Sequence, residues 1–275
     1  MSNFAENQSA MDNFLGYVVS GLIGVSLGLI GGGGSIIAVP MLVYLFHIEP
    51  VFATAYSLVI VGSTSLVGSI RSSLNKMVDF KTAFLFSIPS LVAVYLTRHF
   101  LLPQIPSMIF AAGAFILTKD TLLMIFFSAL MIIASFKMIT SKAAEVEEGS
   151  EIQFDYLKMS IQAIILGIVT GIIGAGGGFL IIPALVLFAG LGMKKAIGTS
   201  LVIITINSLS GFLGDLGTGI QLNYPLVAII SGFAIAGVFI GTYLSKFIDG
   251  SNLKKGFGWF ALAMALVILA KELFF

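Results

Sequence analysis

The chain contains no cysteine and only two histidines, and just 10% of its 275 residues are charged. Without cysteine there can be no disulfide framework, thiol nucleophile or thiolate metal site. His47 and His99 are far apart in the sequence, each beside the end of an apolar segment, so we predict neither a histidine metal site nor a catalytic triad. The formal net charge of +1 provides no basic field to attract nucleic acid.

Apolar residues take the place of charged ones. They make up 58% of the chain, and the mean hydropathy is +1.08. An average soluble domain carries about 25% charged residues, so polar surface is too scarce here for a soluble globule. A spanning helix needs roughly 20 residues, which leaves room for about eight to ten segments in a lipid bilayer. We therefore predict a multi-pass protein of the cell (inner) membrane.

Apolar runs between charged residues or Pro/Gly breaks predict ten helical segments. Five precede a polar stretch, at about 14–30, 35–47, 51–70, 81–100 and 121–140, and five follow it, at about 157–173, 178–190, 195–213, 224–247 and 253–274. The first 13 residues contain no Lys or Arg, unlike the start of a cleaved signal peptide, so the first segment is expected to be retained. The stretch 101–118 has two prolines near its start and is expected to be re-entrant or interfacial. The acidic stretch 141–156 is predicted to be a solvated linker.

The residues on either side of this linker form an internal repeat, 14–140 and 157–275. GLIGGGGSIIAVPMLVYLF, which starts at Gly28, aligns without gaps to GIIGAGGGFLIIPALVLFA, which starts at Gly171. The offset is 143 residues, and it also pairs Ser65 with Ser208. Agreement over this length is not expected by chance.

The basic residues predict the orientation of the repeats. If all five segments of a half cross the membrane, the second half enters upside down relative to the first. With the N-terminus outside, only Arg98, Lys119 and Lys271 lie outside, and the linker is cytoplasmic. The other basic residues lie inside, as the positive-inside rule requires: Arg71, Lys76, Lys81, Lys137, Lys142, Lys158, Lys194, Lys195, Lys246, Lys254 and Lys255. The same parity results if 14–30 and 35–47 form one re-entrant hairpin. The prediction is thus an all-α polytopic protein of two inverted-topology repeats with about five helical segments each, and Gly/Pro-broken or re-entrant segments at the centre.

Each half places a glycine cluster before a proline, and the prolines, Pro40 and Pro183, are predicted helix breaks. Glycine costs about 1 kcal/mol and proline about 3 kcal/mol within a helix, and irregular backbone at membrane depth survives only inside protein or beside a wet cavity. Paired broken segments are typical of a transporter's central site, where free amides and helix dipoles hold an anion. The alternative is close helix packing through small residues. The predicted anion-binding positions are Gly31, Gly33, Gly34, Ser35, Gly174, Gly176, Gly177 and Gly178.

A second polar group lies on the segments 51–70 and 195–213. Most hydroxyls there can bond to their own helix, but an amide within a span needs partners. Asn207 and its repeat counterpart Thr64 are followed by the matched Ser65 and Ser208, and these four are the best side-chain candidates for hydrogen bonds to an oxyanion. Alternatively, Asn207 bridges two helices. The candidate binding residues on these segments are Ser57, Thr64, Ser65, Ser200, Asn207 and Ser208.

Charged residues are not expected in the middle of any span, so an anion site built from buried arginines or lysines is not predicted. Arg71 and Asp215 come closest, near the ends of 51–70 and 195–213. Arg71 is either a gating residue that receives an anion or an ordinary topogenic arginine. Asp215 is the carboxylate best placed for proton coupling, or it caps its helix.

The duplicated G-x-G-G-G-x-x-x-x-P type signature at Gly31 to Pro40 and Gly174 to Pro183, with AIGTSL at Ala196 to Leu201, resembles the TauE/SafE (TSUP) family of sulfite exporters. The first half departs from it with ATAYSL at Ala53 to Leu58, which makes the sites of the two halves unequal. The resemblance implies an integral membrane transporter of sulfite, sulfoacetate, thiosulfate or related organosulfonates, coupled to protons. It does not specify which anion. No ATP-binding motif is visible in the sequence, so we expect a secondary transporter, and we expect no cofactor.

Alternating access around a midplane site is expected for such a transporter. A passive anion channel, or a permease for a different small organic anion, remains an alternative. A membrane enzyme is not predicted, because no span carries paired carboxylates or a nucleophile with its base.

Overall fold

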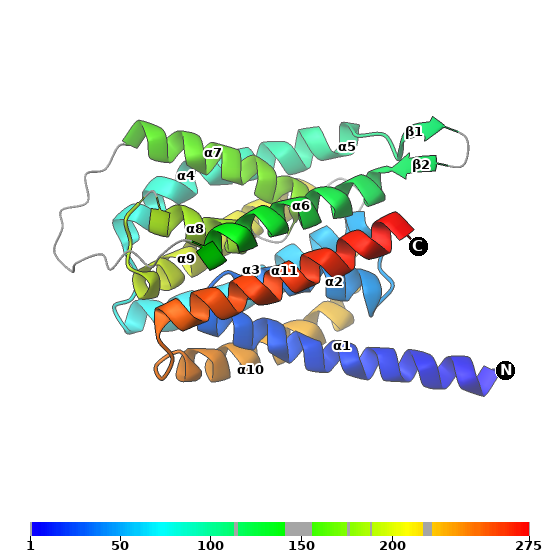
Figure 1. The fold of residues 1–275 in the computed structure, drawn as a ribbon, viewed down its shortest axis with the longest axis horizontal. Coiled ribbons are helices and arrows are strands. Elements are labelled where there is room, and N and C mark those ends of the chain that lie inside the picture. The colour runs from blue at the N-terminus through cyan, green and yellow to red at the C-terminus, as the bar shows by residue number, and fades with distance from the viewer. Residues whose placement is uncertain are drawn as a thin grey trace.

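The computed structural model describes residues 2–112, 115–140, 156–174, 177–187, 189–216 and 222–274. The regular secondary structure in these ranges is helical except for one short β-hairpin (Figure 1). The main helices are α1 (Ser2–Ile30), α2 (Gly33–Tyr44), α3 (Pro50–Leu74), α4 (Phe80–Leu96), α6 (Lys119–Thr140), α7 (Tyr156–Ile173), α8 (Gly178–Leu187), α9 (Met193–Asp215), α10 (Tyr224–Leu244) and α11 (Gly250–Phe274). The ten helices expected from hydropathy are therefore confirmed, most of them to within a few residues at each end.

Five stretches are long and apolar enough to cross a membrane: α3, Phe80–Gln104, α6, α9 and α10. Their outer faces carry large apolar side chains that no other part of the described chain covers, such as Phe84 and Ile88 on α4 and Phe233 on α10. A surface of this kind is suited to lipid rather than water. The protein is a polytopic, multi-pass membrane protein.

The first helix begins earlier than expected, at Ser2 instead of near residue 14. Neither glycine nor proline occurs before Gly16, so nothing in the polar N-terminal residues stops the helix from extending outward.

The stretch 101–118 contains the hairpin. Helix α4 continues through a π-helical turn, η1 (Thr97–Leu101), into the short α5 (Leu102–Gln104), and the chain then forms β1 (Met108–Ala112) and β2 (Phe115–Thr118). The Lys119 side chain donates to the Leu102 carbonyl at 2.6 Å and ties the base of the hairpin to α5. The expectation of an all-α chain therefore needs this correction: residues 101–104 continue the helical stretch that begins at Phe80, and the strands β1 and β2 follow. That the stretch 101–118 is re-entrant or interfacial stays a prediction.

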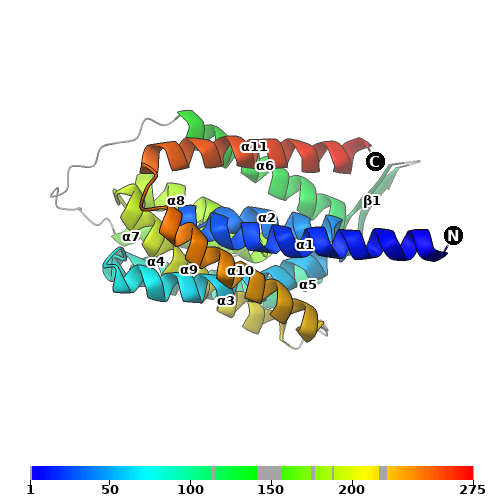
Figure 2. The same ribbon diagram turned by 90° about the horizontal axis from the view of Figure 1, so that it is seen from below.

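Helices α3 and α9 pack against each other, and each also contacts a helix of the other half: α10 lies on α3 and α4 on α9. Helix α1 runs along α10, and α7 runs along α4. Helices α6 and α11 pack side by side on one face of the remaining helices (Figure 2). Both chain termini lie at the same end of the molecule (Figure 1).

Isolated glycines allow the outer helix pairs to approach closely. A Cβ added at Gly24 of α1 would lie 2.6 Å from the backbone carbon of Ala234 on α10, and one at Gly237 would lie 2.8 Å from the Val25 nitrogen. Gly167 of α7 meets Ser90 of α4 in the same way. These glycines serve helix packing of the small-xxx-small kind.

Candidate functional site

The glycine clusters end one helix and begin the next. Helix α1 is followed by Gly31 with φ of 79°, and α7 by Gly174 with φ of 72°. Their N–H groups donate to the carbonyls of Leu27 and Thr170 at 2.8 and 2.9 Å, so each helix closes with a left-handed residue that glycine tolerates best. The chain then reverses, and α2 and α8 begin.

The prolines do not break their helices, contrary to prediction. Pro40 lies inside α2 and Pro183 inside α8, and both helices continue past them. A proline removes a single backbone donor, and the packed surroundings of α2, where Gly33 to Leu42 are all buried, hold the helix together around this loss.

The two glycine breaks meet inside the protein. A Cβ added at Gly178, the first residue of α8, would lie 2.8 Å from the Gly32 Cα, at the start of α2. The first amides of a helix have no partner within it, and they carry the positive end of the helix dipole. The starts of α2 and α8 therefore bring two sets of partial positive charge together among buried residues.

The individual positions in the breaks differ in their surroundings. Gly34 packs against α1, where an added Cβ would lie 2.6 Å from Leu27 Cγ. Gly177 has φ of 64° and packs on Thr170. The Ser35 hydroxyl donates to the Gly32 carbonyl at 2.7 Å, and Gly33 is buried as the first residue of α2. Gly176 lies outside the described residues.

Each glycine turn packs on the long central helix of the other half. Ser57 of α3 donates to the Gly174 carbonyl. A Cβ at Gly31 would lie 2.7 Å from Ser200 Oγ of α9, and Ser200 itself donates to the Ile197 carbonyl at 2.8 Å. Ser57 and Ser200 thus lie beside the breaks, and both hydroxyl protons have protein acceptors.

The four central candidates divide into two pairs. Thr64 donates to the Ile60 carbonyl of its own helix at 2.6 Å, and the Asn207 Oδ1 accepts from Ser90 of α4 at 2.8 Å. Asn207 therefore does bridge two helices. The hydroxyls of Ser65 and Ser208, in contrast, are buried and have no hydrogen-bond partner among the described residues.

Buried hydroxyls without a partner are costly, at about 1–3 kcal/mol each. The other hydroxyls of this kind are scattered over α4, α6 and α7: Thr82, Ser87, Ser135 and Thr170. Within the described part of the chain, only Ser65 and Ser208 are related by the 143-residue repeat offset. Ser208 also lies on the α3–α9 seam, because a Cβ added at Gly62 would be 3.0 Å from its Cβ.

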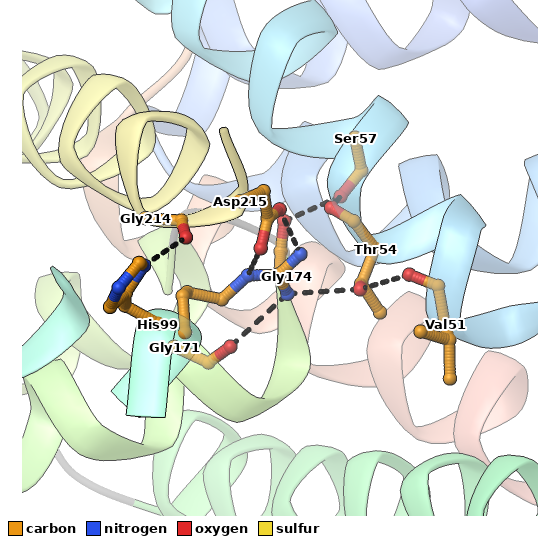
Figure 3. Close-up of polar contacts among 9 residues, drawn as sticks. Val51, Thr54, Ser57, His99, Gly171, Gly174, Gly214 and Asp215 are labelled. Carbon is orange, nitrogen blue, oxygen red and sulfur yellow. Dashed lines mark hydrogen bonds and ion pairs between the residues drawn. The ribbon is translucent and has the colours of Figure 1, made fainter. Parts of the chain in front are cut away.

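A buried ion pair between Arg98 and Asp215 lies where α9 ends and α3 begins (Figure 3). Arg98, in the π-helical turn after α4, is 1% exposed, and Asp215, the last residue of α9, is 5% exposed. The Arg98 Nε donates to Asp215 Oδ1 at 2.8 Å, and Nη2 donates to Oδ2. Nη1 donates to Thr54 Oγ1 of α3 at 2.9 Å and to the Gly171 carbonyl of α7 at 3.2 Å. One guanidinium thereby joins the ends of α3, α4, α7 and α9.

The structure places Arg71 and Asp215, the two charged residues singled out from the sequence, far apart. Arg71 lies near the opposite end of α3, where its guanidinium is 5.1 Å from the centre of the Phe239 ring, far from Asp215. Arg98, expected outside the membrane interior, is buried. The two partners are 117 residues apart and do not obey the repeat offset, so the repeat alignment could not pair them. A usable signal existed, because Arg98 and Asp215 both lie at segment ends that the topology assigns to the outer side.

The π-helical turn Thr97–Leu101 is a structural feature that also marks this region as a candidate functional site. Such turns insert an extra residue into a helix and are frequent at functional sites. Here the turn carries both Arg98 and His99, and the His99 Nδ1 lies 3.1 Å from the Gly214 carbonyl, beside Asp215.

Comparisons with known proteins identify the family of this chain. The family model of the sulfite exporter TauE/SafE matches residues 17–268. The chain belongs to this family. Among relatives of this chain, a probable membrane transporter protein of Xylella fastidiosa (strain 9a5c) is 28% identical over 90% of this chain and 92% of its own. YunE of Bacillus subtilis, another probable membrane transporter protein, is 29% identical over 75% of this chain and 80% of its own.

A further probable membrane transporter protein, from Haemophilus influenzae, is 27% identical over 92% of this chain and 97% of its own length. No solved structure matches the chain. The TauE/SafE match places this chain in a family of membrane transporters.

Proposed function

We propose that this protein is a secondary active transporter of small sulfur-containing anions, such as sulfite, sulfoacetate or thiosulfate, and that it is coupled to protons. The anion binds between the two halves, where the starts of α2 and α8 meet and where Gly178 packs on Ile204, four residues before Ser208 on α9. Ser65 and Ser208 would contribute their unpartnered hydroxyls to this site. This matched pair of hydroxyls is the observation that carries the proposal. A sulfonate or sulfite oxygen accepts hydrogen bonds from hydroxyls and from free helix amides, so no buried cation is needed at the site.

The two halves form inverted repeats in this proposal, and the packing supports it. The 143-residue offset relates α1 to α7, α3 to α9, and α4 to α10. The packing of α1 on α10 then corresponds to that of α7 on α4, and the packing of α10 on α3 to that of α4 on α9. Helices α3 and α9, α2 and α8, and α6 and α11 each contact their own counterpart.

The directions of α6 and α11 agree with inversion. Helix α6 leaves the end of the molecule that carries the hairpin, whereas α11 runs toward that end and finishes there at the C-terminus (Figure 1). Counterpart helices that run in opposite directions are expected of halves that enter the membrane from opposite sides. Alternating access would come from rocking of one half against the other. We place the end with both termini outside and the acidic linker in the cytoplasm.

Proton coupling would act at Asp215, with Arg98 as its gating partner. Protonation removes the negative charge that holds the guanidinium, and so weakens the link among α3, α7 and α9. A proton arriving from outside would thereby open that end of the protein.

Replacing Ser65 or Ser208 with alanine should raise the KM for the transported anion about 10-fold or more, because a hydrogen bond to a charged group contributes about 1.5–3 kcal/mol. Folding should not suffer, since each hydroxyl is buried without a partner in the described structure. Ser128→Ala is the matched control, because the Ser128 hydroxyl bonds only to the Ile125 carbonyl of its own helix, α6. An unchanged KM in both serine variants would contradict the proposed site.

Uptake into proteoliposomes tests the function itself. We expect saturable transport of at least one of labelled sulfite, thiosulfate and sulfoacetate, and faster transport with a pH gradient. A flux that does not saturate and ignores the proton gradient would indicate a passive channel. No flux of any of the three anions would refute the substrate class.

A further inference from the structure

A cavity of about 180 Å³ opens near the end of the central helices opposite Arg98. Its lining comes from α1, from the C-terminal ends of α3 and α10, and from the start of α9, and it includes Gly28, Ser72, Asn75, Lys194, Thr242 and Lys246. Thr54, which contacts Arg98, and Ser72 lie 18 residues apart on α3, or roughly 27 Å at the usual rise of an α-helix. The cavity and the ion pair are therefore at opposite ends of the same helix.

The cavity carries only positive charge on its described lining. Lys194 and Lys246 both contribute to it, and no carboxylate does. Ser72 and Thr242 are 3% and 4% exposed, so the hydroxyl-bearing part of the lining is deep while both lysines are exposed at the rim. An ammonium group is a compact charge that suits small anions, and hydroxyls can orient their oxygens.

The repeat offset relates this cavity to the Arg98 cluster. Adding or subtracting 143 residues converts Gly171 to Gly28, Asp215 to Ser72, and Arg98 to Gly241. At one end of the protein, Arg98 and Asp215 fill the space with two large side chains. Their counterparts at the other end are Gly241, which has no side chain, and Ser72, which has a small one. The equivalent positions of the two halves therefore hold an ion pair at one end of the protein, whereas at the other end Ser72 lines a cavity.

We infer that this cavity, called the lysine vestibule, binds the small oxyanion before it reaches the centre. The inference rests on the proposed function, because the vestibule is a first binding site for the anion that the protein is proposed to transport. This site lies at the end of the protein that carries Lys194 and Lys246. It also assigns the structure to the conformation that is open at this end and closed by Arg98 and Asp215 at the other.

The natural absence of cysteine allows a direct test. Asn75→Cys introduces one thiol at the lining, in protein reconstituted in nanodiscs of zwitterionic lipid. Sulfoacetate should slow its reaction with N-ethylmaleimide at least 5-fold at saturation. Ser72→Cys provides a second, deeper position if the first variant does not fold. Lys195→Cys is the control, because Lys195 is exposed beside Lys194 but does not line the cavity, and its labelling should not respond.

The lysines are tested in the same background. Lys194→Gln with Lys246→Gln should raise the sulfoacetate concentration for half protection about 10-fold, whereas Lys195→Gln should leave it unchanged. Because the lysines are exposed, added salt should weaken protection of the unmodified vestibule. No protection at either cysteine, or protection that ignores both lysines, would overturn the inference.

An anionic lipid headgroup presents similar chemistry. Protection by phosphatidylglycerol nanodiscs without sulfoacetate, together with no effect of free sulfoacetate, would assign the vestibule to lipid and refute the inference. Transport separates this from the proposed function. Saturable sulfoacetate flux without protection would support the proposed transport function and refute the vestibule as an anion site. Protection without flux would support the vestibule as an anion site and refute sulfoacetate transport.

Discussion

Arg98→Met should lower the free energy of unfolding by roughly 3–5 kcal/mol, the usual cost of breaking a buried ion pair from one side. The variant leaves the Asp215 carboxylate buried without its guanidinium and also removes the bonds to Thr54 and Gly171. Thermal or denaturant unfolding in detergent measures the loss. Arg71→Met is the control, because Arg71 contacts Phe239 at an incompletely buried position, and it should change stability by less than about 1 kcal/mol.

A double variant separates folding from gating. Replacing Arg98 by methionine and Asp215 by leucine removes both charges, and such apolar replacements of buried pairs are often neutral or stabilising. We expect the double variant to recover most of the lost stability and yet to transport without dependence on the pH gradient. A double variant as unstable as Arg98→Met would show that the arginine acts through Thr54 and Gly171 and not through the carboxylate. Normal proton dependence would contradict the gating role.

Gly174→Ala should abolish folding, or cost at least about 3 kcal/mol. A non-glycine residue in the left-handed region costs roughly 1–2 kcal/mol, and overpacking a close contact costs a further 1–3 kcal/mol. Both apply here, because φ is 72° and the new Cβ would lie 2.7 Å from Thr54 Cα, which is backbone and cannot rotate away. Size-exclusion chromatography and thermal unfolding of the purified variant measure the outcome.

The chain offers a control for this substitution. Gly232 lies inside α10 with nothing within 4 Å of an added Cβ, so Gly232→Ala should be neutral or should stabilise by up to about 1 kcal/mol through helix propensity. Gly31→Ala should fall between the two, since the new Cβ would lie 2.7 Å from a side-chain atom, Ser200 Oγ, and 2.9 Å from its nearest backbone atom, the Ile197 carbonyl oxygen. If Gly174→Ala were as well tolerated as Gly232→Ala, the glycine turn would not be a packing constraint.

The helices could be predicted because hydropathy and helix breakers act locally. Ten apolar runs became ten helices, and both glycine clusters became the ends of α1 and α7 and the starts of α2 and α8. Two predictions failed where contacts beyond the local sequence decide the backbone. Proline predicts a helix break, but tertiary packing around α2 and α8 holds these helices together. The apolar stretch at 108–118 does not indicate from its sequence that it pairs as strands.

The candidate site was proposed from the sequence, but its detailed contacts could not be. Ser65, Ser208 and the glycine turns stood out because the repeat offset makes the two halves comparable. Which hydroxyls are free could not be predicted, because it depends on whether each side chain finds a partner on another helix. Asn207 finds Ser90, whereas Ser65 and Ser208 find none among the described residues.

The amino-acid sequence by itself determined that the chain lies in a membrane, that it is built of two related halves, and that its backbone is interrupted at matching glycines. These properties follow from hydropathy, from the repeat and from the conformational freedom of glycine, all of which are encoded residue by residue. Only the tertiary structure decided that Arg98 pairs with Asp215 and that the matching place at the other end is a cavity between Lys194 and Lys246. Ion pairs and cavities form between helices that are distant in the chain, so they depend on the packing that brings those helices together.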